Sequence, residues 1–142
     1  MAKSREQLID EMLDREAIKD LPVRYCHYVW TNNLEGILSL FTDDGLFSTE
    51  GPTEPYAIKG QAALREFYST IPDRVGARPF IHNIVVDLKS PKQATGACYL
   101  ELRSAAQQMK WTGTGYYDDE YEKVGDRWKF KARRFKMVHS ET

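Results

Sequence analysis

The sequence lacks a strong charge of either sign. Its 142 residues carry 20 Lys and Arg against 21 Asp and Glu, a formal net charge of -1. Proteins that bind nucleic acids or anionic membranes usually gather basic residues on one face, because phosphates have to be neutralised. The basic segment 129–136 follows the acidic segment 118–122, which offsets it. We therefore expect no nucleic acid and no membrane as a partner, and we interpret segment 129–136 as the solvated face of a strand.

Residue patterns for metal, nucleotide or covalent chemistry are also missing. The two cysteines, Cys26 and Cys98, have no CxxC spacing, which favours buried thiols over a disulfide or a zinc site. The three histidines, at positions 27, 82 and 139, are scattered, and no glycine-rich phosphate loop follows a predicted strand. We expect no metal and no cofactor.

Long apolar runs are absent as well. No run approaches a membrane span, and the first thirty residues lack the layout of a signal peptide, so we expect a cytoplasmic protein. A composition of 42% hydrophobic and 29% charged residues predicts one globular domain over residues 1–142.

Helical periodicity marks the first half of the chain. Asp14 is a predicted N-cap, and the apolar residues after it recur at helical spacing: Ile18, Pro22, Tyr25 and Val29. A second short helix is predicted over 34–41, followed by a turn at 42–45 and a strand from Leu46. A short strand at 57–59 precedes a helix that starts at Gly60, and its apolar face is Ala63, Leu64, Phe67, Tyr68 and Ile71, with Pro72 ending it.

Alternation replaces the helical period beyond Arg78. Strands are predicted over 80–89, 94–103, 110–124 and 127–138. The pattern is that of an α+β fold, with helices covering one face of a single, strongly curved antiparallel sheet around a conical cavity. Gly113 and Gly115 would permit a bend or a bulge in the longest strand, or else they relieve crowding under aromatic neighbours.

Several segments together resemble one known family. In order they are AIKDLPVRY, LFTDDG, IKGQAALREFY, RPFIHN, ATGACYLEL, GTGYYDDEY and WKFKARR, from about Asp14 to Phe135. The chain resembles the SnoaL-like branch of the nuclear transport factor 2-like superfamily. The resemblance implies a cone-shaped α+β barrel with an apolar pocket for a hydrophobic, ring-containing small molecule, and a homodimer or homotrimer formed through the outer sheet face. The fold hosts dehydratases, isomerases, cyclases, dioxygenase subunits and binding modules, so it does not fix a reaction.

His82 is the leading candidate for a base. It shares strand parity with Ile84, Val86 and Leu88, which predicts an inward imidazole suited to proton abstraction. Alternatively, a backbone carbonyl or water satisfies it at the start of the strand. By resemblance, the catalytic His of the lyase members falls near Pro79, and His82 is then its neighbour.

The resemblance also places Trp30 where those lyases carry the Asp that orients their His. Trp30 then narrows the pocket or stacks on a ring-shaped ligand, or it is ordinary core packing. Tyr25 matches a catalytic tyrosine of a dehydratase member and is our candidate acid or oxyanion donor, unless it is a core residue with a satisfied hydroxyl. Tyr28 lies on the flank of the same helical stripe.

Arg133 matches an arginine that helps a dehydrochlorinase member hold a departing anion, although an exposed position on the sheet is the alternative. Asp119 and Tyr117 share the inward parity of Trp111, which makes Asp119 a candidate carboxylate for His82 or Arg133. The predicted pocket residues are Trp30, Tyr28, Phe47, Phe67, Ile84, Trp111, Tyr117, Asp119 and Arg133.

Two functions follow from these residues. One is a cofactor-independent lyase or isomerase that uses His82 as base and Tyr25 as acid on a ring-bearing carbonyl or hydroxyl compound. The other is a non-catalytic protein of the same fold that binds such a compound or serves assembly.

Overall fold

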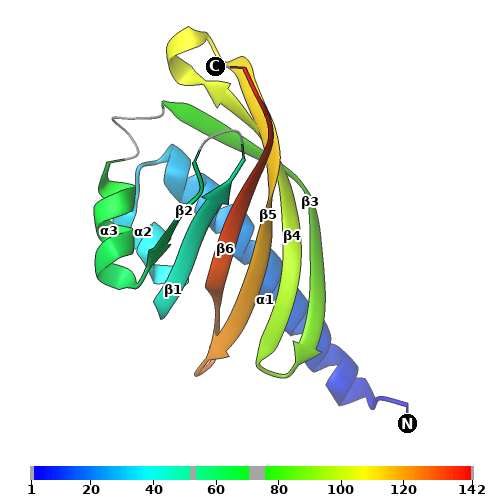
Figure 1. The fold of residues 1–142 in the computed structure, drawn as a ribbon. Coiled ribbons are helices and arrows are strands. Elements are labelled where there is room, and N and C mark those ends of the chain that lie inside the picture. The colour runs from blue at the N-terminus through cyan, green and yellow to red at the C-terminus, as the bar shows by residue number, and fades with distance from the viewer. Residues whose placement is uncertain (1, 52–53, 71–75, 142) are drawn as a thin grey trace.

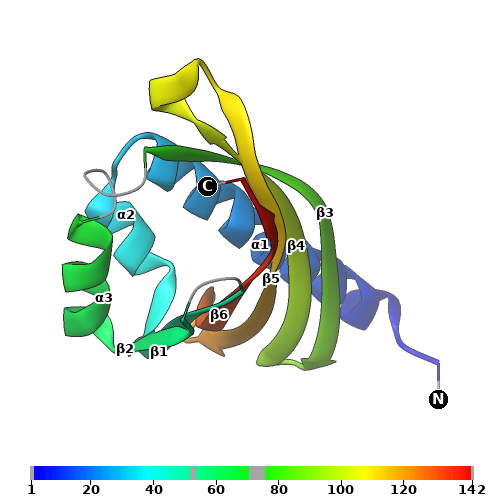
Figure 2. The same cartoon turned by 45° about the horizontal axis from the view of Figure 1, so that its top comes forward.

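Three helices lie against the concave side of a six-stranded sheet in the computed structural model, which describes residues 2–51, 54–70 and 76–141 (Figures 1 and 2). The helices are α1 (Arg5–Trp30), α2 (Leu34–Ser39) and α3 (Gln61–Ser69). The strands are β1 (Phe41–Glu50), β2 (Tyr56–Lys59), β3 (Ala77–Ser90), β4 (Gln93–Ser104), β5 (Lys110–Val124) and β6 (Arg127–Ser140), with a 3-10 turn, η1 (Ala105–Gln107), between β4 and β5. None of the helices in these ranges is long and apolar enough to cross a membrane.

The strand order is β2-β1-β6-β5-β4-β3, so β2 and β3 are the edges of an open sheet. The predicted α+β architecture, with the helices on one face of a curved sheet, is confirmed. The prediction of a purely antiparallel sheet is wrong for one pair, because β1 runs parallel to β6. These two strands are far apart in the sequence, and no hairpin turn forces them to run in opposite directions.

The long helix α1 begins nine residues before the predicted N-cap Asp14. Ser4 is the cap: its hydroxyl accepts the backbone N–H of Gln7 at 3.1 Å, and the Gln7 side chain accepts the backbone N–H of Ser4 at 2.8 Å. This reciprocal pair satisfies two N–H groups that a helix start otherwise leaves open. Asp14 instead lies within the helix, where its carboxylate accepts from the Trp128 indole at 2.9 Å. It therefore fastens α1 to the β5–β6 hairpin.

The core lies between α1 and the sheet. The buried face of α1 contains Ile18, Pro22 and Tyr25, as the helical spacing predicted, together with Leu21, which it did not predict. The fourth predicted residue, Val29, is partly buried against the same core. Aromatic rings from α3, β1, β5 and β6 fill the space beneath it. The predicted end of α3, Ile71 and Pro72, lies outside the described residues.

Two β-bulges change which side chains face this core. Ile81 pairs with Leu100 and Ile84 pairs with Cys98, so His82 and Asn83 together stand opposite a single residue of β4. An extra residue of this kind reverses the facing of everything before it relative to everything after it. The predicted inward orientation of His82 is therefore wrong, and its side chain is 55% exposed on the convex face.

A second bulge, where the pairing shifts between Leu102 and Arg103, reverses which side chains at the start of β5 face the core. It pairs Trp111 with Arg103 and turns the indole to the convex face, where it stacks on His139 with ring centroids 5.7 Å apart. The expected inward position of Trp111 is wrong for the same reason as that of His82. Both errors come from extending a period of two through an inserted residue.

The glycine at position 115 is required by a third irregularity. The register of β5 against β6 shifts between Thr114 and Gly115, and a Cβ atom on Gly115 would lie 2.4 Å from the Lys136 carbonyl oxygen. The extra residue at this shift is Val138, so the bulge lies on β6 rather than on the strand for which it was predicted. Gly115 relieves crowding against the β6 backbone and not under aromatic neighbours.

We predict that Gly115→Ala lowers the free energy of unfolding by about 1–3 kcal/mol, because the added methyl has to displace backbone rather than a flexible side chain. Urea denaturation followed by circular dichroism measures the change. Lys110→Ala, on the exposed start of the same strand, is the control and should stay within about 0.5 kcal/mol of the wild type. Equal stability of the Gly115→Ala protein would contradict this account of the bulge.

Candidate functional site

The interior contains one buried ion pair. Arg133 on β6 and Asp119 on β5 stand directly opposite each other in the sheet register, and both side chains are 0% exposed. The Arg133 Nε atom lies 3.2 Å from the Asp119 Oδ1 atom. Asp119 is thus the carboxylate of Arg133, while His82 lies on the opposite side of the sheet. Because an isolated buried charge is very costly, each of these groups depends on the other.

Three aromatic rings enclose the guanidinium. Its central carbon lies 3.5 Å from the ring centroid of Tyr117, 4.3 Å from that of Tyr25 and 4.6 Å from that of Phe130. Aromatic faces carry partial negative charge, so each ring stabilises the cation. Residues from α1, β5 and β6 thereby converge on one charged group.

The pair is not fully hydrogen-bonded. Within the described residues, none of the three guanidinium nitrogens of Arg133 has a hydrogen-bond partner, and Asp119 Oδ1 has none either. The other carboxylate oxygen, Oδ2, accepts from the Tyr121 hydroxyl at 3.0 Å. Buried donors are nearly always satisfied, because an unmet one costs about 1–3 kcal/mol. Within the described residues, the charge of Arg133 is therefore compensated by the Asp119 carboxylate and by aromatic rings rather than by hydrogen bonds.

Phenol groups supply further donors beside this pair. The hydroxyls of Tyr25 and Tyr68 are hydrogen-bonded at 2.8 Å. Burial raises the pKa of Tyr25, Tyr68 and Tyr117 well above the usual value, so all three stay protonated at neutral pH. The cluster contains one cation and several neutral O–H groups, a set suited to holding an oxygen atom with partial or full negative charge.

Burial also changes the pKa values of the two charged groups, Asp119 and Arg133. It raises the pKa of Asp119 to about 6, against the lowering effect of Arg133 and of the Tyr121 hydrogen bond. Burial disfavours the charged form of Arg133, but the neighbouring Asp119 carboxylate and the phenols outweigh it and hold the pKa of Arg133 above its ordinary value. Both groups are therefore charged at pH 7.

A small hollow of about 40 Å³ opens next to this cluster, where the end of α1 meets α2, α3 and the start of β3. Its lining residues are Val29, Trp30, Asn32, Ile37, Tyr68, Gly76, Ala77 and Arg78. The volume suffices for a few water molecules. A ring compound therefore requires side chains at this end of the molecule to move. Tyr68 lines the hollow and bonds Tyr25, so it connects the opening to the buried pair.

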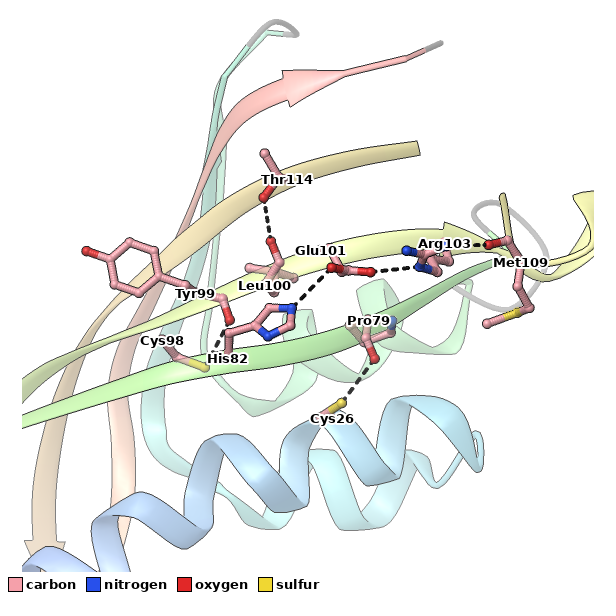
Figure 3. A network of polar contacts seen from close by, with 10 residues as sticks. All are labelled: Cys26, Pro79, His82, Cys98, Tyr99, Leu100, Glu101, Arg103, Met109 and Thr114. Atoms are coloured by element: carbon pink, nitrogen blue, oxygen red, sulfur yellow. Dashed lines mark hydrogen bonds and ion pairs between the residues drawn. The ribbon is translucent and has the colours of Figure 1, made fainter. Parts of the chain in front are cut away.

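Trp30, at the position that resemblance assigns to the lyase Asp, contacts Pro79, near which the lyase His falls. The Trp30 indole donates to the Pro79 carbonyl oxygen at 2.7 Å. The Cys26 thiol donates to the same oxygen at 3.3 Å, as Figure 3 shows. The ring of Trp30 also packs edge-on against the ring of Phe80, with the ring centroids 5.3 Å apart. Neither Trp30 nor Pro79 has a side chain that acts as an acid or a base.

His82 belongs to a polar network on the convex face. Its Nε2 atom lies 3.2 Å from the Glu101 carboxylate, which also accepts from Arg103 (Figure 3). The sheet separates this imidazole from the buried pair. His82 therefore has no access to a ligand in the interior.

Apart from Trp111, which faces the convex side, the predicted pocket residues and Tyr25 fall into three groups. Trp30 lines the hollow, whereas Tyr25, Tyr117, Asp119 and Arg133 form the buried cluster beneath it. The remaining members pack into the core around the cluster: Tyr28, Phe47, Phe67 and Ile84. In the described part of the chain, no group of three or more His, Cys, Asp or Glu side chains is placed to hold a metal ion.

Sequence reasoning missed Tyr68 and Tyr121 as members of the cluster. Tyr121 has the same strand parity as Tyr117 and Asp119, so alternation alone indicates that it faces inward. Tyr68 lies on the apolar face of α3, where a phenol needs a hydrogen-bond partner.

Comparison with known proteins agrees with this geometry. The model of the SnoaL-like domain family matches residues 10–134. A function-unknown protein from Mycobacterium tuberculosis is 26% identical, with a TM-score of 0.82 over 93% of this chain and 76% of its own. No curated protein matches the chain.

Two further solved structures share the fold at lower identity. An NTF2-like protein with a cystatin-like fold from Novosphingobium aromaticivorans is 17% identical (TM-score 0.81, covering 94% of this chain and 87% of its own). A hexachlorocyclohexane dehydrochlorinase from Novosphingobium barchaimii is 19% identical (TM-score 0.78, covering 93% and 91%).

We predict that Arg133→Met and Asp119→Leu each lower the free energy of unfolding by about 3–5 kcal/mol, because each leaves a buried charge without its partner. The double variant should lose much less than the sum. Urea denaturation of all four proteins gives the coupling. Lys136→Met breaks the neighbouring exposed pair with Asp118 and should cost under about 1 kcal/mol. Additive losses at Arg133 and Asp119 would show that the two groups do not depend on each other.

Asp119 should also impose a pH dependence on stability. Its carboxyl titrates at about 6 in the folded chain and near 3.9 when unfolded. As the pH rises from about 3 to 7, the unfolded chain loses this proton first, so the contribution of Asp119 to stability falls by about 3 kcal/mol. Between about pH 3 and 7, we expect the free energy of unfolding of the wild type to fall by about 3 kcal/mol relative to that of Asp119→Asn. Denaturation curves recorded at several pH values across this range measure the difference. Parallel pH profiles of the two proteins would contradict the raised pKa.

Proposed function

Because the chain belongs to the SnoaL-like domain family, we propose that it is a pocket protein that binds a hydrophobic, ring-containing small molecule and holds an oxygen atom of that molecule with Arg133 and the neighbouring phenols. The ligand enters at the hollow beside Trp30 and Tyr68, and side chains at this end of the molecule move to admit it toward Arg133. Binding does not involve His82, which lies on the convex face.

The guanidinium of Arg133, whose nitrogens have no hydrogen-bond partner within the described residues, carries this proposal. A core that serves stability alone gains nothing from a buried Arg whose terminal nitrogens bond to nothing within the described residues. A ligand oxygen at hydrogen-bond distance would satisfy those nitrogens. The Asp119 carboxylate keeps the guanidinium ionised and in place, so the donors are oriented before the ligand arrives.

The surroundings favour a particular chemical class. The inner wall of the cluster is aromatic, formed by Tyr25, Tyr117 and Phe130 around the cation. Flat apolar rings pack well against such walls. The donors prefer a carbonyl, phenolate or carboxylate oxygen over a hydrogen-bond donor, because Arg133 and a protonated phenol both have protons to give. We therefore propose an aromatic or alicyclic ketone, phenol or carboxylic acid as ligand.

A cofactor-independent lyase or isomerase is the second candidate. It is favoured by Asp119, whose pKa of about 6 suits a general base and whose Oδ1 atom lacks a hydrogen bond in the described chain. In this scheme Asp119 takes a proton from a carbon next to a carbonyl. The hydroxyl pair Tyr25–Tyr68 donates to the carbonyl or to the departing hydroxyl, which leaves as water.

We predict that a thermal-shift screen finds ring ketones, phenols or aromatic carboxylates that raise the melting temperature. Tyr68→Phe, which removes only the hydroxyl beside Tyr25, should weaken binding of such a compound about five- to tenfold in calorimetric titration. The matched control is Tyr116→Phe on the convex face, which should bind like the wild type. His82→Ala should also bind normally. Equal binding by Tyr68→Phe would remove the phenol from the site.

Turnover is measured on the same compounds. Deuterium exchange at the carbon next to the carbonyl, followed by NMR in D2O, reports proton abstraction directly. If the protein only binds, no exchange above the buffer rate is expected. Exchange that Asp119→Asn abolishes while the ligand still binds would favour the lyase or isomerase.

A further inference from the structure

The N-terminal half of α1 carries an apolar stripe that faces solvent. It consists of Leu8, Ile9, Met12 and Leu13, which are between 45% and 67% exposed. The four residues recur at helical spacing and therefore form one continuous strip, which we call the outer stripe. Single exposed apolar residues are common on protein surfaces, but a strip of neighbouring ones indicates an interaction site.

This half of the helix has the reverse of the usual pattern. Toward the sheet it presents polar groups, with Glu11 half-buried and Asp14 bonded to Trp128 and Lys123. Only from Ile18 onward does α1 turn an apolar face to the core. At about 100° per residue, the outer stripe lies on the side of the helix opposite to Ile18 and Tyr25. The core of this chain therefore cannot account for these four residues.

The position of the outer stripe agrees with a contact between molecules. The first turns of α1 project beyond the edge strand β3, away from the body of the sheet (Figures 1 and 2). They form a regular helix anchored by the Ser4 capping box. A rigid, protruding apolar helix is accessible to a partner without rearrangement of the fold.

We propose that the outer stripe is a self-association surface, on which α1 of a second copy of this chain packs antiparallel. The charges at the two ends of the stripe identify the occupant. Arg5 and Glu16 are about three turns apart, so both lie in line with the stripe. Neither of them forms an ion pair within the described residues.

The antiparallel register pairs opposite charges at both ends. When Ile9 faces Met12 of the second copy, Leu8 faces Leu13 of that copy and Arg5 faces Glu16. By two-fold symmetry, every one of these contacts occurs twice. A parallel arrangement would instead place Arg5 against Arg5 and Glu16 against Glu16, and it is disfavoured. Four apolar residues per copy are far fewer than the roughly 20–30 per side of a stable interface, so the dimer is weak and forms in the micromolar range or above.

Sedimentation velocity from about 10 μM to 1 mM tests this surface over the expected range of Kd. The wild type should show a concentration-dependent monomer–dimer equilibrium. Arg5→Glu and Glu16→Arg should each weaken it about tenfold or more, because each sets like charges against each other. The double variant, and an equimolar mixture of the two single variants, should regain it. An acidic residue in the first turn favours the helix, so Arg5→Glu should leave the circular dichroism spectrum unchanged.

Two further variants separate this surface from other contacts. Met12→Glu should abolish dimerisation, whereas Val85→Glu on the convex sheet face should leave it intact. The proposal is overturned if the wild type remains monomeric at all concentrations. It is also overturned if Val85→Glu removes the dimer and Met12→Glu does not, which would place the contact on the sheet. Binding of monomers to phosphatidylcholine vesicles, lost in Met12→Glu, would assign the stripe to a lipid surface instead.

Discussion

The ion pair between Arg133 and Asp119 constrains most of the interior. A guanidinium with no exposed surface has to be compensated from every side, and here the compensation comes from a carboxylate on the adjacent strand and from rings on α1, β5 and β6. The helix α1 and the strands β5 and β6 therefore all meet at this one charge. Such an arrangement specifies one packing of the core, because an alternative packing would leave the buried guanidinium without its carboxylate and its rings.

The charge of Arg133 is balanced, but its guanidinium nitrogens form no hydrogen bond within the described residues. The phenols of Tyr25 and Tyr68 bond each other rather than the guanidinium. The charge of Arg133 is therefore met by the Asp119 carboxylate and by ring faces. Tyr68 is the member of the phenol pair that also lines the hollow.

Much of the fold and part of the cluster could be predicted from the sequence. Tyr25, Tyr117 and Asp119 lie in stretches where the helical or alternating period is unbroken, so counting positions placed them correctly toward the interior. Counting left the facing of Arg133 open, because an extra residue, Lys131, interrupts the alternation of β6 just before it. His82 and Trp111 lie beyond bulges, and the sequence contains no local signal for the residue that a strand inserts. The start of α1 was missed because Asp14 is itself a good capping residue, and only its tertiary bond to Trp128 explains its position within the helix. The hollow depends on how three elements meet, which no single segment encodes.

The hydrogen bond between Trp30 and Pro79 has a consequence for how this scaffold can change. The indole and the carbonyl preserve the mutual approach of two positions on different elements, α1 and β3, while neither residue ionises. The bulge after Ile81 keeps Pro79 buried and directed toward the helix. The contact therefore fixes the end of α1 against β3 through groups that do not titrate, so a change of pH does not act on it, whereas a substitution of Trp30 removes the donor and frees this end of the helix.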